Sequence, residues 1–195
     1  GHCAVSQASW SGSGDRMNAL LPDMDRVSEL MKTAAAEIIL PRFRALKDGE
    51  IDEQDGGELV TVSDIETEAW LTQRLPDLVP GSTVVGEEAV FADKSVFDRL
   101  AADDPVWGID PVDGTWNFAN GRETFAVIVA YVVHGEVHAG WIYEPVSEAL
   151  AIGARGDGVR LSGQDVTLGD SGAEAAFVGT AARYLRERAE AAPEI

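Results

Sequence analysis

The sequence contains a single cysteine, Cys3, among its 195 residues. One thiol cannot form an intramolecular disulfide, so the chain is not a small secreted fold held together by disulfides, and we expect a reducing, cytoplasmic setting. Long apolar runs are also missing. The longest, residues 125–133, has the length of a strand and falls far short of the ~20 residues that a helix needs to cross a bilayer. We therefore expect no membrane-spanning helix.

Basic residues are scarce. The chain has 15 Lys and Arg against 34 Asp and Glu, which gives a formal net charge of −19. A surface of this sign repels the phosphates of nucleic acids and of anionic lipids, so we expect neither nucleic-acid binding nor docking on a membrane. A small anionic substrate can still bind if metal ions reverse the local field.

Two helices are predicted in the first half of the chain. Apolar residues recur at three- and four-residue intervals over 24–38, which indicates a helix that Pro41 either kinks or ends. Ser63 followed by Glu66 predicts a capping box that opens the second helix. Between the two helices, residues 47–58 are acidic and rich in glycine, so we predict a mobile loop there.

Short apolar segments bounded by turn residues predict a series of strands. These segments are residues 59–62, 83–85, 106–109, 125–133, 137–143, 149–153, 158–161 and 175–179. A further helix is predicted over 183–192. Two helices, an antiparallel sheet and a new strand-helix unit predict an α+β domain over 17–165 and the beginning of an incomplete α/β domain over 166–195. Residues 1–16 are polar and are expected to be a flexible tail or tag remnant.

Residues 110–115 (DPVDGT) place two carboxylates three residues apart, directly after a predicted strand. Pro111 fixes one backbone torsion and Gly114 permits an unusual turn, so Asp110, Asp113 and a backbone carbonyl can be aimed at one point. Oxygen ligands in such an arrangement suit Mg²⁺. Taken alone, however, Asp-x-x-Asp-Gly is more often an ordinary surface turn.

Two further groups of acidic residues favour a metal site over a turn. Glu87 and Glu88 follow another short predicted strand, and Asp64 follows a third and opens a helix. Three strand ends that each deliver a carboxylate can build a site for two or three metal ions. An EF-hand is excluded, because position twelve counted from Asp110 is Gly121 rather than Glu. Haloacid-dehalogenase phosphatases are excluded too, since their Asp-x-Asp-Gly-Thr motif has a shorter gap and lies near the chain start.

Together these segments resemble the inositol monophosphatase family, within the magnesium-dependent, lithium-sensitive sugar-phosphatase superfamily. The matching residues are 59–64 (LVTVSD), 86–88 (GEE), 107–118 (WGIDPVDGTWNF) and 154–159 (ARGDGV). The resemblance implies a layered α/β/α/β/α sandwich, of which this chain holds the N-terminal α+β domain and the start of the second domain. It also implies a homo-oligomer, namely a dimer.

The resemblance implies a metal ligand set. Glu87, Asp110 and the Val112 carbonyl would bind a first Mg²⁺, and Asp110 with Asp113 a second. Asp64 would help to hold a third, weaker ion. The family also implies Mn²⁺ as a substitute and Li⁺ as an inhibitor.

Catalytic roles follow from the same resemblance. Glu87 with Thr115 would orient and deprotonate the attacking water, and Asp64 would act through Thr115. The backbone amides of Gly114 and Thr115 would receive the substrate phosphate. The expected activity is hydrolysis of a small phosphate monoester, most of all inositol 1-phosphate. Histidinol phosphate and 3′(2′),5′-bisphosphate nucleotides stay open as alternative substrates.

The sequence departs from the family pattern in four places. The family carries a lysine shortly before the Asp64 strand, where Lys47 is the only lysine nearby, and an Asp where Glu58 stands. Trp116 is larger than the usual residue after the Gly-Thr pair, and we expect it to be packed. No Trp-Asp-x-Ala-Ala-Gly segment, whose Asp would complete the metal site, occurs after Ala192. We therefore expect a shortened chain with little or no activity; a fragment that serves self-association or partner binding is the alternative.

Overall fold

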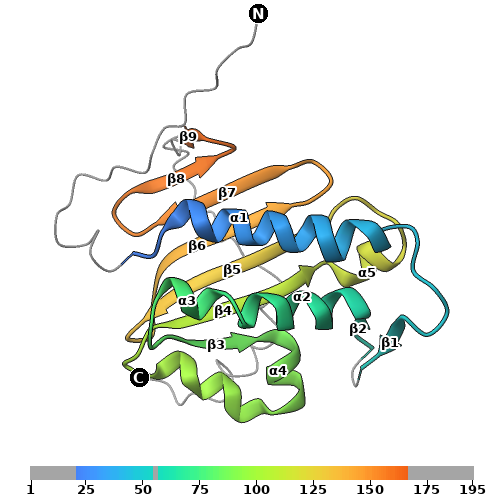
Figure 1. Cartoon of the computed structure of the whole chain (residues 1–195), viewed down its shortest axis with the longest axis horizontal. Coiled ribbons are helices and arrows are strands. Elements are labelled where there is room, and N and C mark those ends of the chain that lie inside the picture. The colour runs from blue at the N-terminus through green and yellow to red at the C-terminus, as the bar shows by residue number, and fades with distance from the viewer. Residues whose placement is uncertain (1–20, 55–56, 167–195) are drawn as a thin grey trace, which may run out of the picture.

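A seven-stranded sheet organises the fold, with the strand order β3-β4-β5-β6-β7-β8-β9 (Figure 1). The computed structural model describes residues 21–54 and 57–166. The strands are β3 (Thr83–Gly86), β4 (Val106–Asp113), β5 (Ala126–Val133), β6 (Glu136–Glu144), β7 (Ala149–Ala154), β8 (Gly158–Leu161) and β9 (Gln164–Val166). Neighbours pair antiparallel from β4 to β9, whereas β3 pairs parallel with β4. The predicted strand at 175–179 and helix at 183–192 lie outside the described residues.

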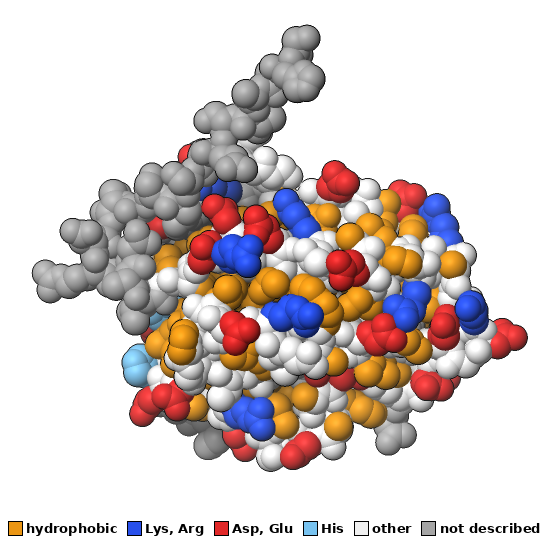
Figure 2. All heavy atoms as spheres, viewed as in Figure 1, with side chains coloured by type: hydrophobic (Ala, Val, Ile, Leu, Met, Phe, Trp, Pro, Cys, Tyr) orange, Lys and Arg blue, Asp and Glu red, His pale blue; other side chains and the backbone are white. Residues whose placement is uncertain are grey.

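Helices α1 (Met24–Ala34) and α2 (Val62–Thr72) lie side by side across one face of this sheet (Figure 1). The helical path of α1 continues through a π-helical turn, η2 (Ala35–Ile39), and a 3₁₀ turn, η3 (Leu40–Arg42), and ends just past Pro41, as predicted. Figure 2 shows this helix face, where acidic and basic side chains are interspersed among apolar ones. No helix within residues 21–54 and 57–166 has the length and hydropathy to cross a bilayer.

The core lies between the sheet and these two helices. Trp107 of β4 and Trp141 of β6 are fully buried there. Each indole N–H has an acceptor, since Trp107 Nε1 donates to Ser82 Oγ (3.0 Å) and Trp141 Nε1 donates to the Met24 carbonyl (3.2 Å). Both bonds satisfy the polar end of a buried ring, and the Trp141 bond also ties the start of α1 to the sheet. The α+β class predicted from the sequence is confirmed.

The capping box of α2 differs from the one predicted. Thr61 and Asp64 form it, with Asp64 Oδ2 accepting the Thr61 N–H (2.9 Å) and Thr61 Oγ1 accepting the Ser63 N–H (3.2 Å). Glu66 pairs instead with Arg42 (2.9 Å). The helix therefore begins at Val62, which the sequence had placed in a strand. Because Asp64 is a capping residue, its carboxylate is fixed at the start of α2.

The remaining elements surround the ends of β3 and β4. A two-stranded ribbon of β1 (Ile51–Glu53) and β2 (Leu59–Thr61) occupies part of the segment predicted to be a mobile loop, so that prediction was wrong for β1. The helical elements are α3 (Leu75–Leu78), α4 (Glu87–Ala92), the 3₁₀ helix η4 (Lys94–Ala101) and α5 (Thr115–Ala119). Sequence periodicity did not identify these four short helices.

Candidate functional site

Glu87 and Asp110 meet because β3 and β4 run parallel. In this pair Gly86 lies opposite Ile109, so Glu87 and Asp110 are the next residue of each chain segment. Parallel strands deliver their carboxyl ends to the same edge of a sheet. The Glu87 and Asp110 side chains are hydrogen-bonded to each other. Two of the acids predicted to share a site are therefore direct neighbours.

Asp113 joins them through a bulge in β4. Asp110 lies opposite Ile128 and Asp113 opposite Ala126, so β4 advances three residues while β5 advances two. In a regular strand, residues three apart point to opposite faces; the extra residue lets Asp110 and Asp113 serve one side. Their proximity is felt electrostatically, since Asp113 helps to raise the pKa of Asp110. Pro111 falls inside the bulge, where its missing N–H costs no ladder bond.

Gly114 ends β4 in the left-handed region, with φ 89°. A Cβ there would lie 3.1 Å from the Thr124 carbonyl oxygen, so both the torsion and the space require glycine. The unusual turn predicted at Gly114 is present. It leads directly into α5, whose first residue is Thr115.

Thr115 connects the β4 turn to Asp64. Its Oγ1 lies 3.0 Å from Asp64 Oδ1 and 2.9 Å from the Val112 carbonyl oxygen. A hydroxyl carries one proton, so Thr115 donates to one of these acceptors at a time. Asp64 is almost completely buried. Burial raises its pKa, and hydrogen bonds from Thr61 and Thr115 partly oppose that rise.

Asp110 is the most strongly perturbed acid of the site. Burial, then the negative charge of Glu87 and its hydrogen bond, raise the pKa of Asp110 to about 9, and Asp113 and Asp64 add to the effect. Asp110 is only half-buried as a residue, but its Oδ1 is fully buried and has no hydrogen-bond partner. Among the described residues, the hydroxyls of Ser63 and Thr67 share this condition. Of these three buried atoms without a partner, the Asp110 oxygen is the one that carries negative charge. A bound cation would therefore satisfy it.

The other acids show the same local excess of negative charge. Burial raises the pKa of Glu87; its hydrogen bond with Asp110 lowers it, while Asp64, Glu58 and Glu68 raise it further. Burial also raises the pKa of Glu88 to about 7, although a hydrogen bond from Gln54 (2.8 Å) opposes the rise. Acids that resist ionisation without a counter-charge are typical of a cation site.

The donor set fits a hard divalent cation, since it consists of carboxylate and carbonyl oxygens. Over residues 21–54 and 57–166, however, no group of three or more Asp, Glu, His or Cys side chains is gathered closely enough to hold a metal ion. Asp64 faces Thr61 and Thr115, and Glu87 is bonded to Asp110. A divalent ion would therefore have to replace the hydrogen bond between Glu87 and Asp110.

Sequence reasoning missed Glu68, which lies one helical turn after Asp64 on α2. Its carboxylate accepts the backbone N–H groups of Glu88 (2.8 Å) and Ala89 (3.0 Å). The Asp-x-x-x-Glu spacing from Asp64 puts both side chains on one face of the helix, and that spacing was visible in the sequence.

Trp116 is not packed as predicted. Its side chain is 52% exposed, and the Arg122 guanidinium lies 4.6 Å from its ring centroid. Phe118 fills the buried position of α5 instead, against Phe43 and Phe125. A helix this short has one buried face, and Phe118 occupies it.

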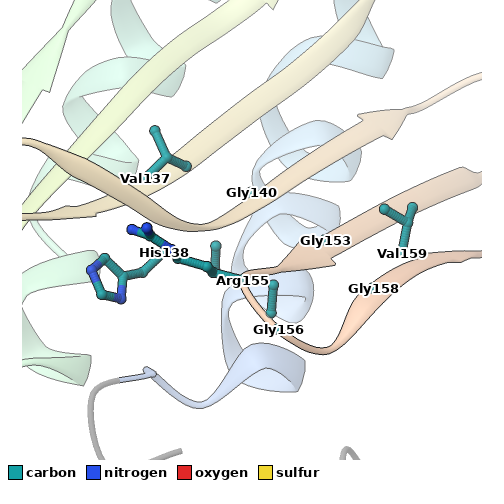
Figure 3. A pocket seen from close by; sticks show the side chains of 10 residues that line it. Val137, His138, Gly140, Gly153, Arg155, Gly156, Gly158 and Val159 are labelled. Carbon is teal, nitrogen blue, oxygen red and sulfur yellow. The ribbon is translucent and has the colours of Figure 1, made fainter. Parts of the chain in front are cut away.

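One hollow of the described structure lies away from the acids. It measures about 560 Å³ and lies over β6, β7 and β8 (Figure 3). Glycines and small apolar side chains line most of it, together with His138 and Arg155. Arg155 is already paired with Glu136. The hollow therefore brings no carboxylate and no unpaired cation, and the chemistry belongs to the acid cluster.

Comparison with known proteins identifies relatives. The sequence profile of the Inositol monophosphatase family matches residues 21–192. Inositol monophosphatase 1 of Bos taurus is 34% identical over 111 residues, which cover 57% of this chain and 39% of that protein. The fructose-1,6-bisphosphatase/inositol-1-monophosphatase of Thermotoga maritima is 29% identical over 128 residues, 66% of this chain and 46% of that protein. Inositol monophosphatase II of Staphylococcus aureus superposes with a TM-score of 0.59 at 27% identity, over 74% of this chain and 50% of that chain.

This chain spans half or less of the length of those three proteins. The profile match nevertheless runs through the acid-bearing strand ends, the β4 turn and the sheet that follows. The chain belongs to the inositol monophosphatase family, a family of phosphomonoesterases.

Proposed function

We propose that this chain carries the metal-binding and water-activating residues of a phosphomonoesterase, with inositol 1-phosphate as the first candidate substrate. The observation that carries the proposal is the side-by-side placement of Glu87 and Asp110, with a buried Asp110 oxygen that has no partner. That arrangement is costly unless a cation binds there. An acid cluster next to a backbone turn at Gly114 suits phosphate held through metal ions.

Glu87, Asp110, Asp113 and the Val112 carbonyl are the groups that would hold two Mg²⁺ or Mn²⁺ ions, and Asp64 would contribute to a third. When bound, such ions lower the pKa of a coordinated water and neutralise charge on the phosphate oxygens. The Val112 carbonyl already lies at the site, because it contacts Thr115 Oγ1.

Thr115 and Asp64 would handle the proton of the attacking water, together with Glu87. When Thr115 Oγ1 donates to Asp64 Oδ1, 3.0 Å away, its lone pairs are available to accept a hydrogen bond from water. Asp64 is itself held by Thr61 in the α2 capping box, which supports a role for Asp64 as the acceptor in this relay. The N–H groups of Gly114 and Thr115, where β4 passes into α5, would receive a phosphate oxygen.

The substrate class is supported by the relatives. The name of the Thermotoga maritima protein joins fructose 1,6-bisphosphate to inositol 1-phosphate, and both are phosphate esters of polyols. Histidinol phosphate and 3′(2′),5′-bisphosphate nucleotides are the alternatives. A dimeric, cytoplasmic enzyme, and the division of the chain at residue 165, belong to the same proposal.

A phosphate-release panel tests the activity. We expect Mg²⁺-dependent release that is fastest with inositol 1-phosphate, and slower with fructose 1,6-bisphosphate, histidinol phosphate and 3′-phosphoadenosine 5′-phosphate. The blank is Asp113→Asn, which keeps the shape of the side chain and removes its charge. Release that survives both EDTA and this substitution would overturn the proposal. Metal binding without release from any ester would favour the alternative of an inactive fragment with a binding role.

Metal binding should also raise the free energy of unfolding of the chain. Because repulsion among the acids is relieved only in the folded, metal-bound state, Mg²⁺ at one hundred times its Kd should stabilise the chain by ~2.7 kcal/mol. Differential scanning calorimetry with Mg²⁺, Mn²⁺ or Ca²⁺ measures this. The control is NaCl at equal ionic strength, since salt alone screens a net charge of −19. A melting temperature that divalent ions raise no more than NaCl does would contradict the metal site.

A further inference from the structure

Glu68 reaches from the middle of α2 to the start of another helix. Its carboxylate accepts the N–H groups of Glu88 (2.8 Å) and Ala89 (3.0 Å), which belong to the first turn of α4. The N-cap of α4 is Gly86, which has no side chain to fill that role. The first N–H groups of a helix have no partner within it, so Glu68 supplies the capping acceptor from a different helix.

Gly86 provides an independent observation of the same contact. A Cβ at Gly86 would lie 2.1 Å from Glu68 Cδ and 2.4 Å from each of its carboxylate oxygens. The backbone of Gly86 has φ −101°, which any residue can adopt. A Cβ at position 86 therefore fits only if the Glu68 carboxylate moves away, whereas the backbone torsion sets no such limit.

The Glu68 contact is retained against an electrostatic cost. Its negative charge adds to the field that raises the pKa of Glu87, and Glu68 itself resists ionisation because it is buried. A neutral cap would avoid that repulsion. In the structure, however, each N–H group donates to a different oxygen of Glu68, Oε2 for Glu88 and Oε1 for Ala89. A glutamine side chain has a single acceptor oxygen and cannot reproduce that arrangement. Geometry therefore accounts for an acid at this position.

We infer that Glu68 is a positioning residue, whose carboxylate holds the backbone of residues 87–89 so that the Glu87 side chain meets Asp110. This inference rests on the proposed function. Helix α2 then positions two parts of the site. Asp64 accepts a hydrogen bond from Thr115, and Glu68, one turn later on the helix, holds the segment that carries Glu87. The distance between water-activating and metal-binding groups is set by one rigid helix.

The test compares two substitutions of Glu68 by Mn²⁺ affinity, measured by isothermal titration calorimetry on this chain. Glu68→Asp keeps the charge and loses one methylene of reach, whereas Glu68→Gln keeps the reach and one acceptor and loses the charge. Positioning predicts that Glu68→Asp weakens Mn²⁺ binding about tenfold or more, and more than Glu68→Gln does. A pure field effect predicts the reverse order and would overturn the inference. The matched control is Glu66→Gln on the same helix, whose side chain pairs with Arg42 and is 47% exposed.

A double-mutant cycle with Gly86→Ala separates positioning from general loss of structure. If the Glu68 carboxylate is what excludes a Cβ at position 86, Gly86→Ala should weaken Mn²⁺ binding in the parent chain and have little further effect beside Glu68→Ala. Amide hydrogen exchange should increase at Glu88 and Ala89 while the core of α2 stays protected. If the losses of Mn²⁺ affinity in Gly86→Ala and Glu68→Ala add up in the double variant, or if Glu68→Asp binds Mn²⁺ as the parent does, the inference is overturned and the proposed function is not. A parent chain that binds no Mn²⁺ would overturn the proposed function and the inference with it.

Discussion

Asp110→Asn should stabilise the metal-free chain at pH 8 and abolish its stabilisation by Mg²⁺. The pKa of Asp110 is raised to about 9, so the folded state binds a proton that the unfolded state releases at much lower pH. Stability conferred by such an acid is present below its unfolded pKa of ~3.9 and is lost as pH rises toward the folded value. Asparagine removes this titration, keeps an N–H donor toward Glu87 and removes the charge that a cation needs.

Thermal unfolding in EDTA from pH 5 to 9 measures the first effect. The free energy of unfolding of the parent chain should fall as pH rises from 5 to 9. In Asp110→Asn this fall should be smaller by roughly 1–2 kcal/mol once solvent screening is allowed for. Asp104→Asn, at an exposed position before β4, is the control for loss of one negative charge. Parallel pH profiles for the parent and Asp110→Asn would show that Asp110 is not the perturbed acid. A Mg²⁺ response that persists in Asp110→Asn would remove it from the ligand set.

Thr115→Val should reduce turnover by about 10²–10⁴-fold while leaving Mg²⁺ stabilisation intact, because a positioned proton-transfer group typically contributes that much. Valine has nearly the shape of threonine, so the contacts of α5 are kept. The hydroxyl that lies between Asp64 and the Val112 carbonyl is lost. The measurement is kcat with saturating Mg²⁺, in whichever length of the chain releases phosphate.

Thr115→Ser is the matched variant, since it keeps the hydroxyl and removes the methyl group. It should retain turnover within about tenfold of the parent, because the hydroxyl that takes part in proton transfer is kept. Equal losses in both variants would assign Thr115 a packing role. Loss of the Mg²⁺ response in Thr115→Val would place the hydroxyl among the metal-binding groups.

The sequence predicted those parts of the site that depend on interactions between residues close together in the chain. An apolar segment followed by an acid is a local pattern: Glu87 follows β3 directly, and Asp110 follows the apolar first half of β4. The glycine needed at position 114 is also local, because a turn with φ 89° excludes other residues. The helix over 24–38 follows from periodicity, which the burial of Val27 and Met31 against the sheet explains.

The parts that the sequence did not predict depend on contacts between distant segments. Ser63 with Glu66 has the same capping-box spacing as Thr61 with Asp64, so the spacing alone does not tell the two pairs apart. The structure forms the box with Thr61 and Asp64, because Glu66 pairs with Arg42 instead. The role of Glu68 depends on α4 packing beside α2, which no local pattern encodes. The bulge in β4 is fixed by its register with β5, so the strand was predicted to end at residue 109 although it continues to Asp113.

The parallel pairing of β3 with β4 has a consequence for how the gene can vary. The connection between the two strands, residues 87–105, can gain or lose residues on its outer part without moving Glu87 or Asp110. Both residues directly follow the last pair of the β3–β4 ladder, Gly86 and Ile109, which anchors them. A single residue inserted within β3 or β4 would instead shift the register and turn the acid to the opposite face of the sheet. Length variation in this half of the protein should therefore collect in the η4 region and be absent from the two short strands.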